Sequence, residues 1–212
     1  MTITIFGATG RMQHLLVQQA LDGGFKVIGY ARTPSKMKIQ HPNLVLKEGT
    51  MLDKAAIEDA IQGSDAVIET VGCVSEGTKL IIQTMKKFNV NRLIVVSTTN
   101  AKDSNDLPDK KFSRLLAVTR FALKVLGLFN RQYGNAVTEL RNIAALVRKS
   151  DLDWTLVRVA GLTNKPKSVE VKSGYLGQGI IGFQTSRADM ATFILNQVTD
   201  KTYIRQAPAI SS

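Results

Sequence analysis

A glycine turn from Gly7 to Gly10 is the first part of the sequence whose residue types and spacing could do chemistry. The apolar run Ile3 to Phe6 leads directly into it, and an amphipathic helical pattern starts at Met12. In such a strand, turn and helix, the first glycine allows the tight turn and the second lets the main chain approach a diphosphate. The free amides at the helix start then meet the negative charge. The turn therefore predicts a pyridine-dinucleotide site.

One position departs from the usual dinucleotide pattern. A small residue normally stands three positions after the second glycine, where the helix packs on the strand, and this sequence has Gln13 there. The alternative interpretation is a strand-to-helix turn that binds nothing. The correct order of strand, turn and helix favours the dinucleotide site.

The choice of cofactor is determined about 20 residues after the turn, where an acidic side chain would bind the ribose hydroxyls of NAD. The segment Tyr30 to Lys36 has no carboxylate. Arg32 can stack on or pair with the adenosine phosphate, while Ser35 and Lys36 could add a hydroxyl donor and a positive charge. These residues predict NADPH rather than NADH. The alternative is that Arg32 and Lys36 are solvated surface charges.

Other residues with reactive side chains are few. Ser97 and Thr98 stand at the end of a predicted strand, where a hydroxyl could bind a substrate carbonyl or simply satisfy loop amides. His14 and His41 are far apart and lack clustered carboxylates, so no metal site is expected. Cys73 is the single cysteine, and we interpret it as a buried, inert thiol.

Alternating β-branched runs and helical patterns in the first half predict βαβ units and a parallel sheet. The predicted strands are Thr2 to Phe6, Lys26 to Ala31, Leu44 to Lys47, Ala66 to Thr70 and Arg92 to Ser97. The predicted helices are Met12 to Asp22, Lys54 to Ile61 after an Asp53 cap, and Glu76 to Phe88. The fold class is therefore α/β, a Rossmann-like doubly wound parallel sheet with helices on both faces.

The second half is less regular, and it is expected to supply the substrate cleft and a small C-terminal cap. Its predicted elements are a surface loop over Asn100 to Lys111, helices over Phe112 to Phe129, Asn135 to Lys149 and Ser186 to Gln197, and strands over Trp154 to Arg158 and Val169 to Lys172. The helix over 112–129 is amphipathic and basic. Core packing of its apolar side is our main interpretation. A cover for the cleft, a dimer face and contact with an anionic membrane are the alternatives.

Length and composition set limits on the class of protein. At 212 residues with 44% hydrophobic residues, the chain is expected to form one domain over 1–212. It has neither a signal-like start nor an apolar run of about 18 residues, and one cysteine cannot form an internal disulfide. A cytoplasmic location is expected.

The net charge is +11, from 28 Lys plus Arg against 17 Asp plus Glu. The positive electrostatic field of such a protein attracts nucleic acid, acidic lipid and phosphorylated cofactors alike. The sequence contains no recognisable nucleic-acid reading motif, and only 6% of its residues are aromatic. Specific nucleic-acid binding is therefore not expected.

Five motifs together carry a resemblance to a known family. They are Gly7-Ala8-Thr9-Gly10, Gly63 to Ile68, Val95 to Thr98, Asp151 to Arg158 and Ser186 to Ala191. With them the chain resembles an atypical short-chain dehydrogenase/reductase of the NAD(P)H-binding, NmrA-like branch, which includes biliverdin reductase B and related flavin reductases. The resemblance covers nearly the whole chain.

The resemblance implies that a cofactor lies across the carboxyl edge of the sheet. It places the phosphates at Thr9, Gly10, Arg11 and Met12, beside Gly7 and Ala8, and the adenosine end at Arg32 and Ser35. It places the adenine at Thr50 and Met51, and the nicotinamide ribose at Thr70, Val71 and Gly72. An acid often follows the family glycine matched by Gly49, and Thr50 replaces it here. We therefore expect the adenine contact to rely on main chain.

The resemblance also bears on the reaction. The usual short-chain dehydrogenase pair is a tyrosine with a lysine four positions later, and here Tyr133 is followed by Val137 and Tyr175 by Gly179. Hydride transfer to a flavin, quinone or bilin asks less of the protein, because the acceptor's conjugated ring takes the hydride and solvent can supply the proton.

The predicted function is an NADPH-dependent oxidoreductase acting on a small planar acceptor, as a monomer or homodimer. The alternative is a non-catalytic redox sensor of the NmrA type. A third possibility is an assembly or interaction factor that uses the same fold.

Overall fold

The computed structural model describes residues 1–71, 74–99, 106, 131–159, 161–168, 170–176, 181–182 and 184–212. The predicted basic helix over 112–129 lies outside these residues, as do Gly72, Cys73 and the side chain of Tyr133. So does the predicted surface loop over 100–111, except for Asp106. Within the described part of the chain, no helix is both long and apolar enough to cross a membrane.

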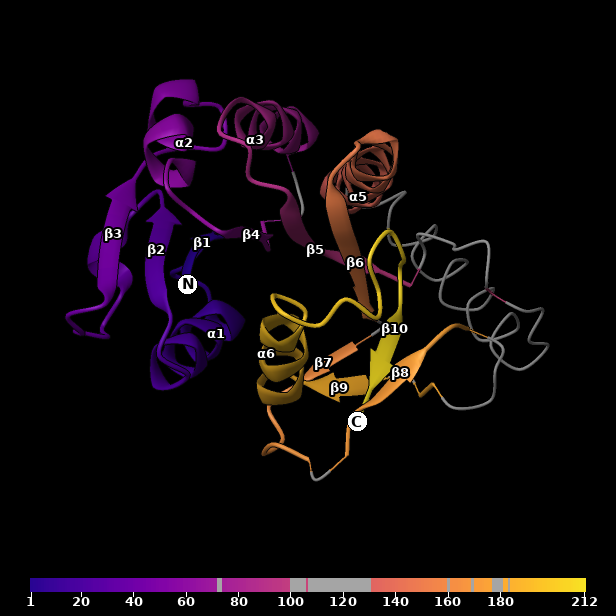
Figure 1. Ribbon diagram of the computed structural model, residues 1–212. Helices are drawn as coiled ribbons and strands as arrows, with labels where there is room; N and C mark the ends of the chain where they lie inside the picture. The colour runs from indigo at the N-terminus through magenta and orange to yellow at the C-terminus, as the bar shows by residue number, and fades with distance from the viewer. Residues whose placement is uncertain are drawn as a thin grey trace.

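A mainly parallel sheet of eight strands forms the centre of the fold, in the order β3-β2-β1-β4-β5-β6-β10-β8 (Figure 1). Its first six strands are parallel to one another. Their bounds are β1 Thr2–Phe6, β2 Lys26–Ala31, β3 Leu44–Glu48, β4 Ala66–Glu69, β5 Arg92–Thr98 and β6 Asp153–Val159. The predicted doubly wound parallel sheet is confirmed, with strand ends within one or two residues of those expected.

Four short strands complete the structure beyond β6. β10 (Ala209–Ser211) is parallel to β6, β8 (Lys172–Gly174) is antiparallel to β10, and β7 (Gly161–Thr163) pairs with β9 (Gln184–Ser186) in a separate two-stranded sheet. The strand predicted over Val169 to Lys172 was misplaced, since β8 begins where that prediction ends. Three-residue strands are too short to show an alternating pattern, so β7, β9 and β10 were not predicted at all.

Helices cover both faces of the sheet, as Figure 1 shows. α1 (Arg11–Asp22) and α6 (Arg187–Asn196) pack together on one face. α2 (Lys54–Ile61), α3 (Ser75–Lys87) and α5 (Arg131–Lys149) lie on the other, and a 3-10 turn spans Pro34–Lys36. The predicted cap of α2 is confirmed, because Asp53 Oδ1 accepts a hydrogen bond of 3.0 Å from the Ala56 amide.

The central strands are buried on both faces, which explains their continuous apolar runs. Along β5, Leu93 and Val95 pack toward α3 and α5, while Ile94 packs toward α1 and α6. Each of these three side chains is fully buried. The two apolar layers hold β1, β4 and β5 rigidly between the helices, so the carboxyl ends of these strands form a stable platform for a site.

Candidate dinucleotide-binding site

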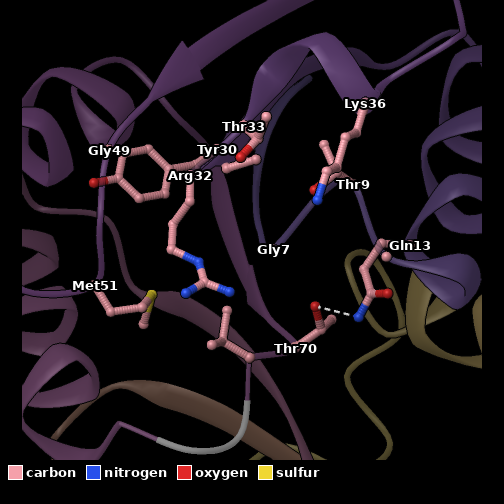
Figure 2. Close-up of a pocket in the computed structure, with 13 residues that line it drawn as sticks. Gly7, Thr9, Gln13, Tyr30, Arg32, Thr33, Lys36, Gly49, Met51 and Thr70 are labelled. Carbon is pink, nitrogen blue, oxygen red and sulfur yellow. Dashed lines mark hydrogen bonds between the residues drawn. The ribbon is translucent and has the colours of Figure 1, made fainter.

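A pocket of about 330 Å³ opens at the carboxyl ends of β1, β2 and β4 (Figure 2). The strand order reverses at this point. From β1 the chain passes to β2 and β3 on one side, and β4 then lies on the other side of β1. Ligands of open α/β sheets bind at such a crevice. The residues that line it are Gly7, Thr9, Gly10, Gln13, Tyr30, Ala31, Arg32, Thr33, Lys36, Gly49, Met51, Thr70 and Val71.

The glycine turn is held in place by its own main chain. The amides of Gly7 and Ala8 donate to the Tyr30 carbonyl at 2.9 and 3.1 Å, and the Gly10 amide donates to the Gly7 carbonyl at 3.2 Å. Gly7 has a φ of +80°, which favours glycine. A Cβ at this position would also stand 3.0 Å from Val71 Cγ2. These three amides therefore shape the turn, and the donors for an anion must come from the start of α1.

The start of α1 presents main-chain donors to the pocket. Its N-cap is Gly10, which has no side chain, and the first amide bonded within the helix is that of His14, to the Gly10 carbonyl at 2.9 Å. The amides of Arg11, Met12 and Gln13 precede it and have no carbonyl to bond within the helix. The first turn of α1, all of it described, carries no acidic side chain. The positive end of the α1 helix dipole is thus suited to a diphosphate.

Two cations line the rim of the pocket. Arg32, at the end of β2, extends into the pocket toward Met51, and Lys36 lies on the side of Thr9 (Figure 2). Both side chains are exposed. None of the described residues that line the pocket is acidic. The rim therefore attracts phosphate and offers no carboxylate to a free ribose hydroxyl.

The wall between β2 and β3 depends on a tyrosine that the sequence analysis did not single out. Tyr30 Oη donates to the Thr50 carbonyl at 2.7 Å, and a Cβ on Gly49 would collide with that hydroxyl. Burial raises the pKa of Tyr30 to about 12, and the charge of Asp53 adds to the rise. The tyrosine is thus a neutral donor that holds the loop after β3 against β2.

A family model described as NAD(P)H-binding matches residues 7–201. The chain belongs to this NAD(P)H-binding family. The match spans the glycine turn, Arg32 and Lys36, and every described strand except β1 and β10, which lie outside it.

Solved structures of the same class share the fold over the whole chain. A short-chain dehydrogenase/reductase from Veillonella parvula is 21% identical with a TM-score of 0.80, covering 100% of this chain and 94% of the other. A second structure of this description, from the same organism and in complex with NADP, has a TM-score of 0.79 at 21% identity, with the same coverage. A Rossmann-fold NAD(P)-binding family protein from Shigella flexneri is 22% identical with a TM-score of 0.75, covering 100% and 93%.

Curated proteins match this chain as well. Cinnamoyl-CoA reductase 1 from Petunia hybrida is 28% identical over 118 residues, which are 47% of this chain and 35% of the relative. The match thus spans about a third of that relative's length. The family match and the shared fold together make this chain an NAD(P)H-binding protein with a Rossmann-like fold.

Most of the residues predicted to bind the cofactor in this NAD(P)H-binding protein meet at the pocket. Those that line it are Gly7, Thr9, Gly10, Arg32, Lys36, Met51, Thr70 and Val71. Ala8 and Met12 are buried beneath it, and the Arg11 and Ser35 side chains are exposed outside its lining. The cofactor-binding roles of all these residues, and of Gly72, stay predictions.

Thr50 lies next to the pocket but not in its lining. Its carbonyl accepts from Tyr30, and its Oγ1 accepts a hydrogen bond of 3.3 Å from the Leu52 amide. The carbonyl oxygen and the hydroxyl oxygen of Thr50 thus already accept hydrogen bonds within the protein. Thr33 also lines the pocket and was not predicted from the sequence. Gly49 lines it too, and the sequence indicated Gly49 only as the residue that matches the family glycine before Thr50.

The predicted catalytic hydroxyls do not line the pocket. Ser97 is 3% exposed, and its Oγ has no hydrogen-bond partner among the described residues. Thr98 is half-buried on the next position of β5. Tyr175, one of the two tyrosines considered, donates its hydroxyl to Gln206. Substrate binding by Ser97 and Thr98 stays a prediction.

A buried carboxyl stands at the end of β4, next to the pocket. Glu69 is 1% exposed, and its Oε1 accepts a hydrogen bond of 2.7 Å from Thr78. Its Oε2 has no partner among the described residues. Burial raises the pKa of Glu69 to about 7, against the opposing effect of the Thr78 hydrogen bond. Thr70 and Val71, the next residues, line the pocket.

Proposed function

We propose that this protein is an NADPH-dependent reductase of the NmrA-like branch that transfers hydride to a small planar acceptor of the flavin, quinone or bilin type. The observation that carries the proposal is the pocket itself. It joins the donors at the start of α1 to the cations Arg32 and Lys36 across one crevice. NADPH needs both features, because its diphosphate and its adenosine 2′-phosphate are bound separately.

The preference for NADPH follows from the charges on the rim. A 2′-phosphate placed near Arg32 and Lys36 meets two cations, while the 2′-hydroxyl of NADH finds no carboxylate among the lining residues described. The planar Arg32 guanidinium can also stack on adenine. Phosphate binding by arginine is strong because two parallel hydrogen bonds form.

We expect NADPH to bind at least tenfold more tightly than NADH, and Arg32→Ala to remove most of this difference. The loss of a charge-assisted contact of about 1.5–3 kcal/mol accounts for an effect of this size. Isothermal titration calorimetry with both cofactors measures it. Lys26→Ala is the matched control, since Lys26 is an exposed cation at the amino end of β2. Equal affinities of the wild-type protein for the two cofactors would contradict the preference.

The choice of a planar acceptor rests on the missing tyrosine and lysine pair. Without that proton relay, an acceptor whose conjugated ring takes the hydride and whose proton comes from solvent needs only close stacking on the nicotinamide. Steady-state oxidation of NADPH with a panel of flavins, quinones and bilins tests the proposal. If the cofactor binds and no acceptor raises the rate above the uncatalysed one, a non-catalytic redox sensor replaces the reductase.

One observation favours the sensor as the second candidate. Gln13 lines the pocket at the position where the usual dinucleotide pattern has a small residue, so the turn departs from that of the dinucleotide-binding enzymes. The cytoplasmic location, the monomer or homodimer, and the expected lack of specific nucleic-acid binding stay predictions.

A further inference from the structure

The side chain of Gln13 folds back across the mouth of the glycine turn (Figure 2). Its Nε2 donates to Thr70 Oγ1 at 2.7 Å, and Thr70 Oγ1 in turn donates to the Phe6 carbonyl at 2.8 Å. Because a carbonyl only accepts, the single hydroxyl proton of Thr70 goes to Phe6, and Thr70 must accept from Gln13. This chain of bonds directs the amide nitrogen of Gln13 to β4 and its carbonyl oxygen the other way.

The carbonyl oxygen of Gln13 lies against Gly10. A Cβ built on Gly10 would collide with Gln13 Oε1 and would also lie 2.9 Å from Gln13 Cδ. The second glycine of a dinucleotide turn is the place where the main chain approaches the diphosphate. The carboxamide of Gln13 therefore fills space that a bound diphosphate needs.

An oxygen at this place also has a physical reason to stay there. Gln13 is the third residue of α1, and a glutamine at the third helical position can reach back to the start of its own helix, as in a capping box. Gly10 has no side chain with which to cap, and the first turn has no acid. The neutral oxygen of Gln13 thus lies beside Gly10 at the positive end of the helix dipole.

We propose that the Gln13 carboxamide is an internal competitor for the diphosphate, and that it sets the affinity of this protein for its dinucleotide. The inference rests on the proposed function and adds an affinity-determining residue to it. Binding must break the bond from Gln13 to Thr70 and move the carbonyl oxygen off Gly10. The net contribution of one such hydrogen bond corresponds to a weakening of about three- to tenfold.

The test is calorimetric titration of NADP⁺ into wild-type protein, Gln13→Ala and Gln18→Ala. We expect Gln13→Ala to bind about three- to tenfold more tightly, the gain that follows from one hydrogen bond. Gln18→Ala is the matched control and should bind like the wild type, because Gln18 is exposed on the same helix and bonds only to Asp22 among the contacts described. Gln13→Glu, which places a fixed anion at the same spot, should weaken binding more than tenfold.

Two smaller probes locate the effect. Inorganic pyrophosphate occupies only the diphosphate part of the site, so its affinity should rise in Gln13→Ala by the same factor as that of NADP⁺. Adenosine 2′-phosphate engages only the rim with Arg32, so its affinity should not change. A thermal unfolding curve for each variant shows that the compared proteins are folded.

Weaker or unchanged binding of NADP⁺ by folded Gln13→Ala would overturn the proposal, because it would mean that Gln13 contacts the ligand or stands aside from it. A gain that appears equally with adenosine 2′-phosphate would also overturn it. If no dinucleotide binds to any variant, including the wild type, the proposed function fails, and the role of Gln13 fails with it. Unchanged or weaker binding by Gln13→Ala contradicts the role of Gln13 but still shows that the protein binds NADP⁺. A failure of this role is therefore distinguishable from a failure of the proposed function.

Discussion

Asp106→Ala should lower the free energy of unfolding by about 3–5 kcal/mol, because it removes a carboxylate that forms two charge-assisted hydrogen bonds with a buried guanidinium. Arg158 is fully buried on β6, and its two terminal nitrogens donate to the two carboxylate oxygens of Asp106, each at 2.7 Å. Asp106 also accepts a bond of 3.0 Å from the Leu176 amide. One carboxylate thus holds together three segments that are distant in sequence.

The measurement is equilibrium unfolding in urea, with Asp151→Ala as the control. Asp151 pairs with Lys86 at 2.8 Å, but its side chain is 87% exposed, so its removal should cost less than about 1 kcal/mol. Because both variants remove one aspartate from an ion pair, the difference between their losses in free energy of unfolding measures the effect of burial. A loss for Asp106→Ala no larger than that of the control would contradict the expectation.

Glu69→Gln should remove a large part of the pH dependence of stability between pH 5 and pH 8. Burial raises the pKa of Glu69 from 4.5 to about 7 in the folded protein, so between these values the native state holds a proton that the unfolded chain releases. The free energy of unfolding therefore falls as the pH rises through this window and levels off above it. The free energy of unfolding lost through the ionisation of Glu69 is about 3 kcal/mol.

A glutamine is neutral at every pH in this range, and its carbonyl oxygen can still accept the bond from Thr78. The variant should match the wild type near pH 5 and exceed its stability by about 2–3 kcal/mol at pH 8. Urea unfolding at pH 5, 6, 7 and 8 measures this, and Glu76→Gln, at an exposed position on α3, is the control. Parallel pH profiles for Glu69→Gln and the wild type would refute the assignment.

The core of the fold and the glycine turn could be predicted because their signals are local. The buried run Leu93 to Val96 needs no knowledge of its partners to indicate a central strand, and Asp53 caps the helix that starts one residue later. The short strands β7, β9 and β10 could not be predicted, since three residues carry no period and their pairing depends on segments far along the chain.

In the candidate site, too, local features could be predicted from the sequence and long-range contacts could not. The sequence by itself determined where the glycine turn lies and that a cation, not an acid, follows β2, because both depend on neighbouring residues. Only the tertiary structure decided that Gln13 reaches Thr70, 57 residues away, that Arg158 meets Asp106, 52 residues away, and that Glu69 is cut off from solvent. Burial and long-range hydrogen bonds arise only when distant strands and helices pack together, so no local pattern of residues could have shown them.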